Sequence, residues 1–190
     1  MKKMHEVVVI TGIPGVGKTT VVTDALKMIS TKYEILNFGD VMFSYATSEK
    51  LANTRDEMRK LDPATQKTIQ IKAAEEIQKR AHKTSILIDT HATIKTKKGY
   101  LAGLPIWVLE KLQPTKIILI EADSSEIYTR RVSDKSRVRD DDSEEEIKEH
   151  QELNRSIAMA YAVISGATVS IIRNNNGEIA ISSKKLSEVL

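Results

Sequence analysis

The chain has 190 residues, of which 41% are hydrophobic and 29% are charged, a balance typical of one soluble globular domain. It contains no cysteine, which excludes disulfides and thiolate metal sites, and no apolar run approaches the roughly 18 residues of a membrane span. The net charge is only +3 and aromatic residues make up 4%, so neither a basic stripe nor a stacking platform for nucleic acid is visible. We therefore expect a cytoplasmic protein, with residues 1–190 in a single domain, that binds neither membranes nor nucleic acid.

The first predicted strand leads directly into a glycine-rich loop. Residues 7–10 are four apolar β-branched residues, and residues 12–19 (GIPGVGKT) match the phosphate-binding pattern G-x-x-x-x-G-K-[ST] at every position. An amphipathic helix is predicted next, so the motif has the strand–loop–helix context that its chemistry needs. Glycines let backbone N–H groups wrap the phosphates of a nucleoside triphosphate, while Lys18 would contact the β- and γ-phosphates and Thr19 would bind magnesium.

Apolar strands alternate with helices along the rest of the chain. Further strands are predicted at residues 33–38, 85–91, 116–123 and 168–173, and helices at 41–51, 53–61, 64–82, 106–112, 144–165 and the C-terminus. Residues 95–105 are predicted to form a loop, and residues 125–142 a helix that runs into a charged loop. This alternation predicts an α/β fold in which helices cover both faces of a parallel sheet.

Polar residues follow the ends of several predicted strands, where parallel sheets collect their ligands. Asp89 ends an apolar strand and would hold magnesium directly or through water, with a turn or helix-cap aspartate as the alternative. Asp40 has a similar position. His91 would contact a base or a phosphate, or else serve as a structural hydrogen-bonding residue.

Two sets of arginines lie outside the glycine-rich loop. Arg55 and Arg59 share one helix face and would hold the phosphate of an acceptor. A second set lies between the last two strands and would close over the transferring group as a lid: Arg130, Arg131, Arg137 and Arg139. Phosphoryl transfer needs such groups to align the reactants and neutralise charge, although solvated helix charges are the alternative interpretation.

Several of these motifs together resemble the archaeal adenylate kinases. The matching segments keep the family's order from the first strand to the fifth: TGIPGVGKTT, NFGDVMF, RDEMRKL, DTHATIKTKKGYLAGLP, SRVRD and NRSIAMAYAVISGATVSII. RDEMRKLDP and DTH…GYL…GLP are more specific than the phosphate loop, which many enzymes share. Ala102 stands where the family commonly has proline, which alters loop stiffness more than chemistry, and residues 174–190 match weakly.

The resemblance implies a P-loop NTPase fold with a five-stranded parallel sheet and a short lid, and a homotrimer that reversibly converts MgATP and AMP into two ADP. About residues 38–62 would form the acceptor-binding segment and about residues 130–143 the lid. The residues implied to bind ATP are Gly12, Ile13, Pro14, Gly15, Val16, Gly17, Lys18, Thr19 and Thr20. Catalytic roles are implied for Lys18, Arg59, Arg137 and Arg139, and acceptor contacts for Asp40, Arg55, Arg59, Thr90 and His91.

Two alternative functions remain open from the sequence. One is a kinase for another small acceptor, such as CMP, UMP or a hydroxylated metabolite. The other is an ATP-dependent regulatory or RNA-associated interaction module, whose only support is the slightly basic charge.

Overall fold

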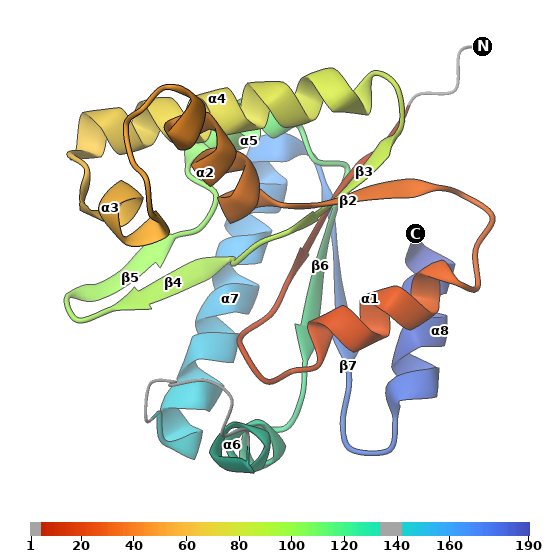
Figure 1. Ribbon diagram of the computed structural model, residues 1–190. Helices are drawn as coiled ribbons and strands as arrows, with labels where there is room; N and C mark the ends of the chain where they lie inside the picture. The colour runs from red at the N-terminus through yellow and green to blue at the C-terminus, as the bar shows by residue number, and fades with distance from the viewer. Residues whose placement is uncertain (1–4, 134–141) are drawn as a thin grey trace.

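A five-stranded parallel sheet forms the centre of the molecule in the computed structural model, which describes residues 5–133 and 142–190 (Figure 1). The strands are β1 (Val7–Thr11), β2 (Tyr33–Asn37), β3 (Ser85–Asp89), β6 (Lys116–Glu121) and β7 (Thr168–Arg173), in the order β2-β3-β1-β6-β7. Central β1 pairs with β3 and β6, so that Val8 lies opposite both Leu87 and Lys116. The predicted α/β fold with a parallel sheet is confirmed.

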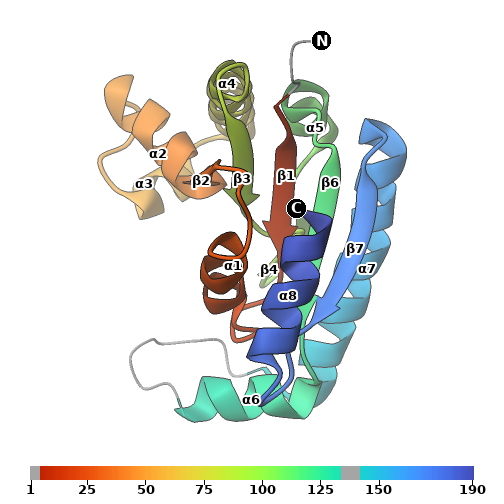
Figure 2. The same cartoon turned by 90° about the vertical axis from the view of Figure 1, so that its right-hand side faces the viewer.

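Helices cover both faces of this sheet, as its nearly continuous apolar strands require. Figure 2 shows α1 (Lys18–Leu26) and α8 (Ile179–Val189) in front of the strands. The opposite face packs against α4 (Pro63–Ala81), α5 (Ile106–Leu112) and α7 (Glu144–Ser165). Alternate residues of β1 supply the two cores: Val7 and Val9 face α4 and α5, whereas Val8 and Ile10 face α1 and α8.

Three shorter elements project from the edge of the sheet near the ends of β1 and β3. They are α2 (Phe38–Ser48), α3 (Arg55–Lys60) and a hairpin of β4 (Thr93–Thr96) and β5 (Gly99–Ala102). The prediction of a loop at residues 95–105 is therefore wrong, because most of this segment belongs to the antiparallel hairpin. Gly99 permits the turn of the hairpin, since its φ of 116° is rarely adopted by residues with a Cβ. Helix α2 also begins earlier than predicted, since Asn37 Oδ1 caps it by accepting from Asp40 N at 3.2 Å.

The long helix α7 buries a more polar face than its sequence suggests. Its buried positions include His150, Gln151 and Asn154, whereas Ile164 is 46% exposed. The buried amide of Gln151 is satisfied because it both donates to Ala122 O (3.0 Å) and accepts from Ala122 N (3.2 Å) just after β6. Within the described ranges, no helix is long and apolar enough to cross a membrane.

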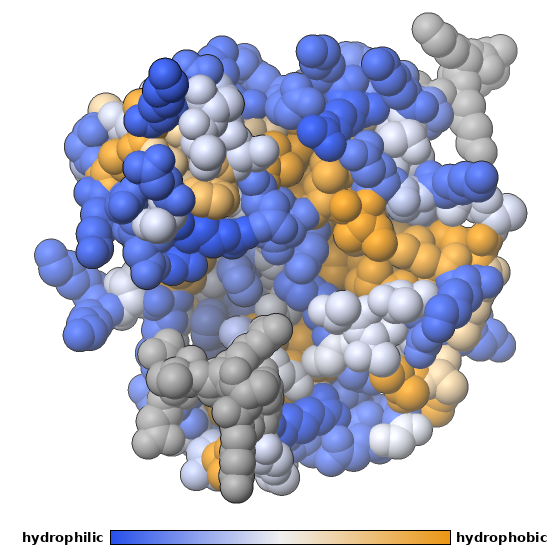
Figure 3. All heavy atoms as spheres, viewed as in Figure 1, coloured by the Kyte–Doolittle hydropathy of each residue, from blue (hydrophilic) through white to orange (hydrophobic). Residues whose placement is uncertain are grey.

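Helix α6 (Ser124–Ser133) follows β6 and lies beyond the carboxyl end of the sheet (Figure 1). The space-filling view shows a recess lined mostly by hydrophilic residues between α2, the hairpin and α1, whereas hydrophobic surface gathers over β2 and between β2 and α1 (Figure 3). The functional groups described below gather around this recess.

Candidate active site

The glycine-rich loop between β1 and α1 surrounds a cavity of about 270 Å³. Its lining residues come from this loop and from the ends of β2 and β3: Gly12, Ile13, Pro14, Gly15, Lys18, Thr19, Asn37, Asp89, Thr90 and His91. Gly17 precedes α1 with a φ of 80°, a conformation that residues with a Cβ rarely adopt. The loop thus aims the first N–H groups of α1 toward the cavity, which is the arrangement that binds phosphate.

Lys18 reaches across this cavity to the end of β3. Its ammonium forms an ion pair with Asp89 and donates to Thr90 O at 3.3 Å. The carboxylate of Asp89 also accepts from Asn37 Nδ2 at 3.5 Å, so the ends of β2 and β3 meet at the base of the phosphate loop. Lys18 is therefore held next to the position that a bound triphosphate would occupy.

Three side chains hold the outer side of the phosphate loop by its carbonyl oxygens. Arg131 Nε donates to Pro14 O at 2.8 Å, Arg130 Nη1 to Gly15 O at 3.3 Å, and Asn174 Nδ2 to Val16 O at 2.8 Å. Arg130 also donates to Asn174 O at 3.1 Å, which joins the end of β7 to α6. These hydrogen bonds restrain the phosphate loop from its outer side.

A second cavity of about 450 Å³ opens beside the first. Both cavities are lined by Asn37, Asp89, Thr90 and His91, so they meet next to Lys18. The far walls of the second cavity come from α2, α3, α4 and the hairpin. The backbone at Gly103 lies so close to the backbone at His91 that a Cβ on Gly103 would collide with the carbonyl oxygen of His91. This arrangement suits two ligands whose reacting ends meet at Lys18.

The arginines predicted to hold an acceptor phosphate do line this second cavity. Arg55 forms an ion pair with Asp40, and Arg59 donates to Asp56 Oδ1 at 2.9 Å. Asp40 itself lines a neighbouring groove between α2 and α4, so it contacts the second cavity only through Arg55. The structure thus brings Arg55 and Arg59 together and leaves Asp40 behind them.

His91 and Thr90 occupy the junction of the two cavities. Burial lowers the pKa of His91, and the positive charge of Lys18 lowers it further, so the imidazole is held neutral at this point. Thr90 N donates to Ile10 O at 3.1 Å, and Ala92 N donates to Thr11 Oγ1 at 2.7 Å. These bonds fasten the segment after β3 to the end of β1, which fixes both residues beside the phosphate loop.

Ion pairs link the hairpin to α6 and the phosphate loop. Asp142 accepts from Lys95 Nζ at 2.6 Å and from Arg131 Nη1 at 2.8 Å, and Arg131 holds Pro14 O. The wall of the second cavity is therefore connected to the phosphate loop through one carboxylate.

A buried hydrogen-bond chain fastens the same hairpin to α7. Thr93 Oγ1 donates to Asn154 Oδ1 at 2.6 Å, and His150 Nε2 lies 2.9 Å from the same hydroxyl. The threonine hydroxyl thus joins the amide of Asn154 to the imidazole of His150. Burial lowers the pKa of His150, which favours the neutral imidazole.

Not every residue implied by sequence reaches a cavity. Val16 is 1% exposed and packs in the core, and Thr20 lies exposed on α1 without lining either cavity. Arg137 and Arg139 lie outside the described residues. Sequence reasoning missed three groups of the site, namely Asn37, Asn174 and Gln70, of which only Asn37 carries a signal, its position at a strand end.

The phosphate cavity offers ligands that suit magnesium. The Thr19 hydroxyl and the Asp89 carboxylate are hard oxygen donors, and both residues line it. Mg²⁺ is usually held by one or two protein oxygens together with substrate phosphates. These residues fit an ion bound jointly with a nucleotide.

Comparisons with known proteins support the same fold. A family model described as an AAA domain matches residues 11–148. Shikimate kinase from Acinetobacter baumannii has a TM-score of 0.55 at 15% identity, covering 98% of this chain and 91% of that one. TT1252 from Thermus thermophilus has a TM-score of 0.57 at 13% identity, covering 98% and 97%. Together with the phosphate loop, these findings define the fold as that of a P-loop NTPase.

Curated relatives identify the family. Adenylate kinases from Methanopyrus kandleri and Methanocaldococcus jannaschii are 52% and 50% identical to this chain, each over 98% of both sequences. The adenylate kinase of Methanothermobacter thermautotrophicus is 49% identical over 97% of this chain and 99% of that one. The chain belongs to the archaeal adenylate kinase family, which confirms the resemblance found from the sequence.

Proposed function

We propose that this protein transfers the γ-phosphoryl group of MgATP to AMP, reversibly, giving two ADP. The observation that carries this proposal is the pair of cavities that share Asp89, Thr90 and His91 beside Lys18. One cavity has a phosphate loop and the other has arginines, so a donor and an acceptor phosphate would meet at one point. Alignment of this kind supplies much of the rate enhancement of phosphoryl transfer.

The donor triphosphate would bind in the phosphate loop. Backbone N–H groups of the loop would contact the β- and γ-phosphates, and Lys18 would leave Asp89 to neutralise the charge that develops during transfer. Magnesium, held by Thr19 and Asp89, would supply charge stabilisation between the phosphates. The pair between Lys18 and Asp89 keeps both groups in place until the ligands arrive.

The acceptor would bind in the second cavity. Arg55 and Arg59 would contact the AMP phosphate, with Asp40 orienting Arg55 from behind. Thr90 and His91 would lie next to the reacting phosphate, and the neutral imidazole leaves the positive charge there to Lys18 and the arginines. Residues 38–62 would thus act as the acceptor-binding segment.

We propose that residues 130–143 form the short lid, from which Arg137 and Arg139 contact both phosphate chains. Closure of such a lid excludes water, which limits hydrolysis of ATP. Arg139→Ala is then expected to lower turnover by orders of magnitude while the melting temperature changes little. Retention of wild-type turnover in this variant would remove Arg139 from the mechanism.

We propose that the protein is a cytoplasmic homotrimer. Exposed apolar residues on α7 and β7 support an association surface, namely Met159, Val163, Ile164 and Ile171. Sedimentation equilibrium tests this point. A monomeric mass at micromolar concentration would contradict it without affecting the proposed reaction.

An acceptor panel separates the proposed reaction from its alternatives. ADP formation from MgATP is measured with AMP, CMP, UMP and no acceptor. Stimulation by AMP supports the proposal, and stimulation by another acceptor alone would favour a different kinase. Slow hydrolysis without an acceptor, together with salt-sensitive RNA binding, would favour the interaction module.

A further inference from the structure

One end of the second cavity combines an apolar wall with two glutamines of α4. Phe38, Met42, Met58 and Ile69 line it together with Gln66 and Gln70. The NH₂ group of Gln66 is already used, because it donates to Arg59 O at 2.9 Å and to Leu61 O at 2.7 Å. Apolar surface with a few convergent polar groups is the usual composition of a site that holds a flat organic ring. The cavity's phosphate end lies at Lys18, so the base of an acceptor nucleotide would occupy this other end.

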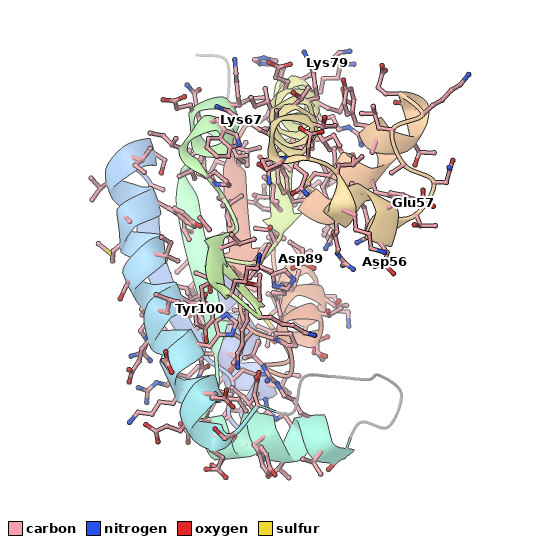
Figure 4. All side chains as sticks on the ribbon, turned by 90° about the vertical axis from the view of Figure 1, so that its left-hand side faces the viewer. Asp56, Glu57, Lys67, Lys79, Asp89 and Tyr100 are labelled. Carbon is pink, nitrogen blue, oxygen red and sulfur yellow. The ribbon has the colours of Figure 1, made fainter. Side chains whose placement is uncertain are left out.

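Gln70 is held in one orientation by Trp107 of α5. Trp107 Nε1 donates to Gln70 Oε1 at 2.9 Å. Indole is only a donor, so the bonded amide atom must be the carbonyl oxygen and the amide cannot be flipped. Trp107 is itself covered by Lys67, whose ammonium lies 4.6 Å from the ring centroid. Figure 4 shows Lys67 on the side of α4 and α5, apart from Asp89 at the phosphate end.

This orientation leaves the NH₂ group of Gln70 available to a ligand. Gln70 lines the cavity, whereas Trp107 does not, so the bond to Trp107 draws the carbonyl away from the ligand. Among the residues that the structure describes, none accepts a hydrogen bond from Gln70 Nε2. The wall therefore presents a donor, fixed by a second residue behind it.

We propose that Gln70, locked by Trp107, selects the acceptor base as a hydrogen-bond donor. The inference rests on the proposed function, because it takes AMP as the acceptor. Adenine carries the acceptor N1 on its Watson–Crick edge, which an NH₂ group can satisfy. Guanine carries N1–H at that position, which would set donor against donor. A site with a fixed polar group rejects a ligand that leaves it unpaired more strongly than an apolar site can.

The test is the ratio of kcat/KM for AMP to kcat/KM for GMP, measured with MgATP. Gln70→Glu keeps an acceptor for Trp107 and turns the group facing the ligand from a donor into an acceptor. We expect the ratio to fall at least ten-fold, with GMP gaining in absolute kcat/KM. Trp107→Phe frees the amide to present either end, so the ratio is expected to fall in this variant as well. A ratio depends little on the fraction of active enzyme, which keeps partly folded variants informative.

Gln78→Glu is the matched control. Gln78 lies two turns further along α4, where its amide donates to Leu112 O at 2.9 Å, and it does not line the cavity. Its ratio should stay within two-fold of wild type. An unchanged ratio in Gln70→Glu, with normal AMP activity in the wild type, would overturn this inference alone. Absence of AMP activity in the wild type would overturn the proposed function as well.

Discussion

Asn174 is predicted to hold the phosphate loop in its binding conformation. Asn174→Ala removes the 2.8 Å bond to Val16 O, and Val16 is 1% exposed, so its carbonyl is left without water. An unpaired buried polar group costs about 1–3 kcal/mol. Asn174 Oδ1 is itself buried without a partner in the described part of the chain, so its removal offsets part of this cost. We expect a loss of stability of about 1–2 kcal/mol.

Two measurements check this value. A loss of about 1–2 kcal/mol lowers the melting temperature by roughly 2–8 °C in a chain of this size. If the same energy is needed to restore the loop on binding, ATP affinity falls about 5- to 30-fold, measured by calorimetry. Asn175→Ala is the control, because Asn175 Oδ1 accepts only from Asp123 N, outside the phosphate loop. Unchanged ATP affinity in Asn174→Ala, alongside a lower melting temperature, would refute a positioning role.

The remaining predictions concern the reacting centre, pH and one buried charge. Lys18→Ala should lower turnover by orders of magnitude, measured as ADP formed from MgATP and AMP, without unfolding the protein. Near-normal ADP formation in this variant would show that Lys18 does not neutralise charge during transfer. Burial lowers the pKa of His91 and of His150 in the folded state, so the unfolded chain binds more protons and stability should fall as the pH drops below about 6.5. Urea titrations at several pH values should show that the free energy of unfolding of His150→Gln falls less steeply below this pH than that of the wild type. The same pH dependence in both proteins would contradict this reasoning. Arg155→Ala should lower the free energy of unfolding by about 2–4 kcal/mol, because the buried carboxylate of Glu121 would lose its partner. In the wild type this carboxylate lies 2.8 Å from Arg155 Nε. The urea midpoint measures the loss, and a value below about 0.5 kcal/mol would show that water reaches Glu121.

The strand and loop that bind phosphate could be predicted because their signals are local. Continuous β-branched residues, a glycine pattern and an amphipathic helix occupy residues 7–26 without interruption. The other parallel strands were likewise predicted near their observed positions, since each is a short apolar run. The hairpin at residues 93–102 was missed because its strands are mostly exposed, and exposed strands carry little hydrophobic pattern.

The supporting residues of the site could not be predicted for a different reason. Asn174 holds a carbonyl 158 positions away in the chain, and Trp107 fixes an amide 37 positions away. Neither residue stands in a spacing that marks such a contact, since the fold alone brings the partners together. Asp142 likewise joins Lys95 and Arg131 only through the packing of the hairpin against α7 and α6.

The most direct test of the account is a coupled assay for ADP formed from MgATP, with AMP, CMP, UMP and no acceptor compared under the same conditions. The account predicts fast ADP formation with AMP, little with CMP or UMP, and almost none without an acceptor. Rates that AMP does not stimulate would contradict the proposal that two phosphate chains meet at Lys18.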